Sequence, residues 1–78
     1  MNHAMASQEL DCKGMNCPMP IVSLSRAMKK LQPGDRLVVE ADDPAFKADL
    51  EAWCSKGGHE LVSFDEGGVQ RAVVKKAA

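Results

Sequence analysis

The stretch GMNCPMP, residues 14–20, places a thiol directly before two prolines and ahead of an amphipathic run. Proline is tolerated in the first turn of a helix because the amide hydrogens there have no intrahelical partner. We therefore expect Cys17 at the N-terminus of a helix, with free backbone N–H groups nearby. The positive end of a helix dipole favours a thiolate over a thiol, which makes Cys17 a candidate nucleophile. The alternative is a small buried hydrophobe near a loop. The residues expected to shape this site are Gly14, Asn16, Pro18 and Pro20.

Outward from this stretch, the sequence predicts two helices and four strands. A short strand over residues 9–12 precedes it, and one apolar stripe of a helix follows at Ile21, Leu24, Met28 and Leu31. A second strand is expected over residues 36–41. Asp43 is the expected N-cap and Pro44 the first residue of a second helix, which Gly57-Gly58 should end. Phe46, Leu50 and Trp53 form the apolar stripe of this helix. Two strands, 60–65 and 69–75, are joined by a hairpin at residues 66–68.

The order βαβαββ predicts an α+β two-layer sandwich. Right-handed crossovers place both helices on one face of a mixed four-stranded sheet. The apolar pattern does not assign the faces of the last two strands, because alternation is poor in both. The other face of the sheet is left open for a partner or a second copy. We expect one domain over residues 9–76, preceded by a flexible N-terminal segment over residues 1–8.

The composition excludes several classes of function. The 78 residues allow one domain, and their net charge of −1 favours neither nucleic acid nor an anionic membrane as partner. No apolar run is long enough to span a membrane. Three cysteines exclude a complete disulfide framework, and the absence of a signal-like segment favours the cytoplasm, where thiols stay reduced. Residues 35–66 hold nine acids against three bases, whereas residues 1–34 are mildly basic. Solvated helix faces explain most of this, and a weak docking surface is the alternative.

Several segments together resemble the TusA/SirA family of small sulfur carriers. They are Leu10-Asp11, Gly14, residues 17–20 (CPMP), residues 33–35 (PGD), residues 41–44 (ADDP) and Trp53-Cys54 with residues 58–61 (GHEL). The resemblance implies a fold like the C-terminal domain of bacterial translation initiation factor three. It implies that Cys17 accepts sulfane sulfur as a persulfide from a cysteine desulfurase or a rhodanese. The sulfur would pass to a cysteine-containing acceptor protein in tRNA thiolation, molybdenum cofactor maturation or sulfur oxidation. The chain itself is expected to hold no cofactor, and its chemistry is that of a carrier rather than of a stand-alone enzyme.

Two positions depart from the family pattern. Asn16 stands where relatives commonly have arginine, so one positive charge near the thiol is missing. Cys12 stands where many relatives have another residue, which raises the possibility of a second thiol at the site. We favour the interpretation that Cys12 points inward from its strand as a small core residue.

Hydrolytic and metal chemistry fit the topology poorly. A Cys-His mechanism needs a base within hydrogen-bond reach, and the chain offers only His3 and His59. In parallel βαβ units both helices begin at one edge of the sheet, so Cys17 and Asp43 share that edge. Cys54 and His59 belong to the other edge, about 18 Å away along a helix of about 12 residues. The spacings Cys12-x4-Cys17 and Cys54-x4-His59 therefore do not predict one tetrahedral metal site. Cys54, near the end of the second helix, is expected to be a structural residue. His59 should pack or cap locally, and Asp43 could also contact a partner.

Two other classes of function remain open. One is a thiol redox or regulatory module that uses Cys12 and Cys17, because a four-residue loop could let the two thiols meet. The other is a non-catalytic interaction module, including an RNA-binding one by fold analogy. The acidic balance and only three aromatic residues argue against direct binding of nucleic acid.

Overall fold

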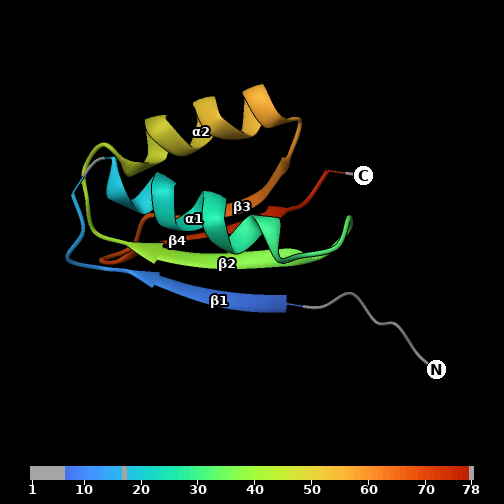
Figure 1. The fold of residues 1–78 in the computed structure, drawn as a ribbon. Coiled ribbons are helices and arrows are strands. Elements are labelled where there is room, and N and C mark those ends of the chain that lie inside the picture. The colour runs from blue at the N-terminus through green and yellow to red at the C-terminus, as the bar shows by residue number, and fades with distance from the viewer. Residues whose placement is uncertain (1–6, 17, 78) are drawn as a thin grey trace.

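A computed structural model describes residues 7–16 and 18–77, so Cys17 and His3 lie outside the described residues. The elements follow the predicted order (Figure 1). They are β1 (Ser7–Cys12), α1 (Met19–Lys29), β2 (Arg36–Ala41), α2 (Phe46–Gly57), β3 (Glu60–Asp65) and β4 (Gln70–Lys75). No helix among the described residues is long and apolar enough to cross a membrane.

The sheet has the strand order β1-β2-β4-β3. β1 pairs with β2 in parallel, and β4 pairs antiparallel with both β2 and β3, so β1, β2 and β3 all run in one direction. Both helices cover the same face of the sheet (Figure 1). The predicted α+β two-layer sandwich with a mixed sheet is confirmed. Since each helix returns against the direction of the strands, both helices begin at the edge where β1 and β2 end.

The core lies between the helices and the covered face of the sheet. The predicted helix stripes supply Leu24, Met28, Phe46 and Leu50, all buried. Fully burying a side chain such as Leu50 or Phe46 is worth about 1.5–3 kcal/mol. Leu31, the last residue of the first stripe, is also buried, although α1 ends before it. Ile21 and Trp53, the remaining apolar residues of these stripes, are only half-buried. They lie at the margin of the core and are available at the surface between the helices.

A bulge in β3 explains why its sequence does not alternate. Leu61 pairs with Val74 and Phe64 pairs with Ala72, but the register shifts between Leu61 and Ser63. Leu61 and Phe64 are three residues apart, yet both pack against the core because the extra residue reverses the pleat.

Three predicted boundaries are wrong by one or two residues. β1 begins at Ser7, so Ser7 and Gln8 belong to the sheet rather than to an N-terminal segment. β4 begins at Gln70, one residue later than expected. α2 begins at Phe46 after an N-cap at Ala45 that has no side-chain cap. The end of α2 is as predicted, with Gly58 in the left-handed region at φ 73°.

Asp43 shapes the turn before α2 instead of capping the helix. Its carboxylate accepts the Ala45 N–H at 3.4 Å, and its carbonyl accepts the Phe46 N–H at 3.0 Å. The same carbonyl accepts the Gln70 side-chain amide at 2.8 Å. This contact from β4 fixes the turn, and α2 therefore begins after the turn, at Phe46.

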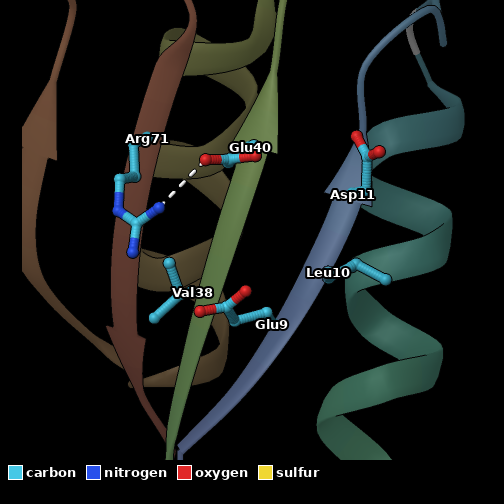
Figure 2. A pocket seen from close by; sticks show the side chains of 6 residues that line it. All are labelled: Glu9, Leu10, Asp11, Val38, Glu40 and Arg71. Carbon is cyan, nitrogen blue, oxygen red and sulfur yellow. Dashed lines mark hydrogen bonds and ion pairs between the residues drawn. The ribbon is translucent and has the colours of Figure 1, made fainter.

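The uncovered face of the sheet is a ladder of charged side chains around a small apolar centre. The Glu40 carboxylate lies 2.9 Å from Nη1 of Arg71 (Figure 2). On its other side it lies 3.0 Å from Nζ of Lys13. These hydrogen bonds, Lys13 first, hold the pKa of Glu40 below its usual value. Val38 lies among the stems of these side chains and is almost buried. Lys13, Glu40 and Arg71 therefore form one connected set of ion pairs on this face.

Candidate functional site

The candidate site lies at the edge where β1 and β2 end. The two strands are in register, with Cys12 opposite Ala41, so the residues that follow them lie side by side. Gly14 donates its N–H to both carboxylate oxygens of Asp42, at 3.0 and 3.1 Å. Gly14 has φ 83°, a conformation that other residues rarely adopt. Asp42 therefore tethers the loop that leads to Cys17.

The chain on both sides of Cys17 is held by further contacts. The Met15 N–H donates to the Cys12 carbonyl at 3.1 Å, which closes a turn directly after β1. The Met15 sulfur accepts the Ser23 hydroxyl of α1 at 3.6 Å. The Asn16 carbonyl accepts the Met19 N–H at 2.8 Å and so joins the residues before and after Cys17. These hydrogen bonds therefore hold the residues on both sides of Cys17 in place.

The start of α1 has fewer spare donors than predicted. Pro18 and Pro20 have no N–H, and Met19 donates to Asn16. Ile21 and Val22 both donate to the Pro18 carbonyl at 3.1 Å. Every N–H of residues 18–22 is therefore engaged, and the expectation of free N–H groups there was wrong. The helix dipole remains as the electrostatic influence of α1 on this edge.

The predicted site residues differ in exposure. Asn16 and Pro18 are exposed, whereas Pro20, in the first turn of α1, is buried. Lys13, the base nearest to this loop in sequence, is paired with Asp11 at 3.2 Å and with Glu40. The Lys13 ammonium group is therefore held against β1 and β2.

Cys12 and Cys54 are both core residues. Cys12 is 0% exposed, and its Sγ lies 3.9 Å from the Pro20 carbonyl. Burial, with a smaller contribution from Asp11, raises the pKa of Cys12, and burial raises the pKa of Cys54. Both groups are therefore held as neutral thiols. The prediction that Cys12 packs inward is confirmed, and so is the structural role of Cys54.

His59 lies at the other end of the molecule and packs locally, as predicted. Its ring stacks on Trp53 with centroids 4.7 Å apart, and its Nδ1 accepts the Ala77 N–H at 2.9 Å. Burial, followed by the charge of Lys76, lowers the pKa of His59. The neutral ring holds the end of the chain, because an Nδ1 acceptor carries its proton on Nε2.

The sequence prediction missed Asp42 and chose its neighbour Asp43. A usable signal was present, since two strands in parallel register that end at Cys12 and Ala41 bring residue 42 beside residue 14. The partial exposure of Trp53 between the helices was also missed, because its position in the apolar stripe of α2 is equally typical of a core residue.

The fold and this junction define a class of protein. It is a small α+β domain in which a cysteine, Cys17 in this sequence, stands between a tethered glycine loop and a proline-flanked helix. The chain belongs to the family described as Sulfurtransferase TusA, which matches residues 8–76.

Curated relatives agree with this assignment, and a solved structure agrees with the fold. YrkI of Bacillus subtilis, named as a candidate sulfur carrier protein, is 46% identical over 86% of this chain and 91% of its own length. A similarly named protein of Archaeoglobus fulgidus is 40% identical over 87% of this chain and 91% of its own length. YrkF of Bacillus subtilis is 44% identical, but the match spans only 37% of that longer protein. The crystal structure of a SirA-like protein from Desulfitobacterium hafniense has the same fold, with a TM-score of 0.77, 19% identity and coverage of 91% of this chain and 99% of that chain.

Proposed function

We propose that the protein is a sulfur carrier that holds sulfane sulfur as a persulfide on Cys17. The observation that carries the proposal is the family match over residues 8–76, together with relatives named as sulfur carriers. The burial of Cys12 and Cys54 supports it, because a thiol that must meet a second protein has to be accessible and partly ionised. Cys17 is the cysteine left for that role.

The chemistry is two successive thiol exchanges on sulfur. The Cys17 thiolate attacks the terminal sulfur of a donor cysteine persulfide, the donor S–S bond breaks, and the donor leaves as a thiolate. A thiolate of the acceptor protein then attacks the terminal sulfur on Cys17, and Cys17 leaves as a thiolate. Each step forms one S–S bond and breaks another, so neither needs an external oxidant or a cofactor on this chain.

The proposed partners are proteins. A cysteine desulfurase, or a rhodanese charged with thiosulfate, supplies the sulfur, and a cysteine-containing protein accepts it. tRNA thiolation, molybdenum cofactor maturation and sulfur oxidation are the candidate destinations. We place the relay in the cytoplasm, where protein thiols stay reduced.

Mass spectrometry of the loaded protein tests the proposal. Incubation with a desulfurase and cysteine, or with a rhodanese and thiosulfate, should add about 32 Da to the peptide that contains Cys17, and dithiothreitol should remove it. Cys17→Ser should abolish the adduct, whereas Cys54→Ser should retain it. An adduct on Cys54 in the Cys17→Ser protein would refute the assignment.

A further inference from the structure

Helices α1 and α2 lie side by side on the sheet (Figure 1). Adjoining hollows between their side chains form an interhelical furrow. The furrow is lined by Pro18, Ile21, Arg26 and Lys29 on one side and by Trp53 and Lys56 on the other. These residues recur at helical spacing, so each helix presents one stripe to the furrow. Three adjoining hollows share Trp53 and make the furrow continuous from Pro18 to His59.

The furrow is electropositive, although the chain carries a net charge of −1. Arg26, Lys29 and Lys56 line it, Lys76 lies at its far end, and Asp49 is the one acid among its lining residues. The ion pairs found in residues 7–16 and 18–77 use other cations, on the sheet and beside the hairpin. Arg26, Lys29 and Lys56 thus take part in none of these ion pairs, whereas Lys76 donates to the Leu31 carbonyl.

Trp53 gives the furrow an apolar centre. It is half-buried and lies against the same hollows as Ile21, which is also half-buried. A half-exposed aromatic side chain surrounded by cations suits a partner with an apolar anchor between carboxylates.

We propose that the furrow docks an acidic segment of the sulfur-donating protein, with carboxylates on Arg26 and Lys29 and one apolar side chain against Trp53. This inference rests on the proposed function. Pro18, at one end of the furrow, directly follows Cys17 in the chain. A segment bound along the furrow is therefore held beside the residue that follows Cys17 in the chain, and its charge complementarity accelerates the encounter.

A protein segment fits the furrow better than single-stranded RNA does. Binding of unpaired bases depends on an open aromatic face for stacking. One face of Trp53 is already occupied by His59, at an interplanar angle of 18°.

Intrinsic fluorescence tests the furrow without any sulfur chemistry, because Trp53 is the only tryptophan of the chain. Poly-L-glutamate, which has no tryptophan, should shift the emission of the wild-type protein at low salt. Arg26→Glu/Lys29→Glu should weaken this response about tenfold, and 0.5 M salt should abolish it because the Debye length is then only about 4 Å. Lys30→Glu/Lys75→Glu is the matched control, since it makes the same change of charge on residues that line none of these hollows. An equal response in both double variants would overturn the inference.

The rate of sulfur loading separates this inference from the proposed function. A desulfurase with cysteine, or a rhodanese with thiosulfate, should load Arg26→Glu/Lys29→Glu about tenfold more slowly than wild type at limiting donor. Sodium polysulfide, a small donor, should load both at the same rate. Equal loading by the protein donors, or tRNA binding that only the furrow variant loses, would overturn the furrow inference while leaving the carrier function intact. Failure of every donor to load wild-type Cys17 would instead refute the carrier function.

Discussion

Asp42→Ala should loosen the loop that leads to Cys17. In the structure both carboxylate oxygens of Asp42 share the single N–H of Gly14, so the substitution removes one charge-assisted hydrogen bond. Such bonds contribute about 1.5–3 kcal/mol, and this one is at the lower end because both residues are exposed. We expect Asp42→Ala to lower the free energy of unfolding by about 1.5 kcal/mol, and Asp42→Asn, which keeps one amide oxygen, by about 0.5 kcal/mol.

Two assays measure this effect. In urea denaturation, a slope of about 1 kcal/mol per molar places the midpoint of Asp42→Ala about 1.5 M below that of wild type. Amide hydrogen exchange should show the Gly14 N–H exchanging about tenfold faster. Asp65→Ala is the matched control, because Asp65 accepts the Gly67 N–H at 2.9 Å in the hairpin, far along the chain from Gly14. If the Gly14 N–H exchanges equally fast in wild type and Asp42→Ala, the hydrogen bond to Asp42 does not stabilise the loop and the prediction is wrong.

Further predictions concern the three thiols and the contact of His59 with α2. Iodoacetamide should modify Cys17 faster than Cys12 or Cys54 in the folded protein, because burial raises the pKa of the latter two thiols. Peptide mass spectrometry measures the three rates, and equal rates would contradict this prediction. The persulfide should release sulfide equally slowly in wild type and Cys12→Ala, whereas slower release from the variant would make Cys12 a resolving thiol. Gly57→Ala should lower stability by about 1–3 kcal/mol, since an added Cβ would lie 2.7 Å from the His59 ring, and an unchanged urea midpoint would exclude that clash. The pKa of His59 in the folded protein is below its ordinary value of 6.5. The stability that the neutral ring contributes is therefore present above pH 6.5 and is lost as the pH falls through the folded pKa. The urea midpoints at pH 7.5 and pH 5 should differ more for wild type than for His59→Asn.

Local features of the sequence determined the order of elements in this protein. Apolar spacing at 3.6 residues fixed both helices, and Gly57-Gly58 fixed the end of the second, because helix geometry and left-handed turns depend on a few neighbouring residues. The order βαβαββ with right-handed crossovers then fixed which helix ends share an edge. This is why the remote position of His59 could be predicted. The inward position of Cys12 was predicted on a different ground, because unpaired cysteines usually pack as small core residues.

Only the tertiary structure decided how distant segments meet. The insertion of β4 between β2 and β3, the bulge that turns both Leu61 and Phe64 inward, and the contact of Gln70 with the turn before α2 all depend on strand register. Register is set by packing across the whole sheet and leaves little trace in any one strand. For the same reason, the sequence determined the candidate nucleophile Cys17, whereas the tether from Asp42 and the cationic furrow around Trp53 became visible only when α1, α2 and the sheet edge came together.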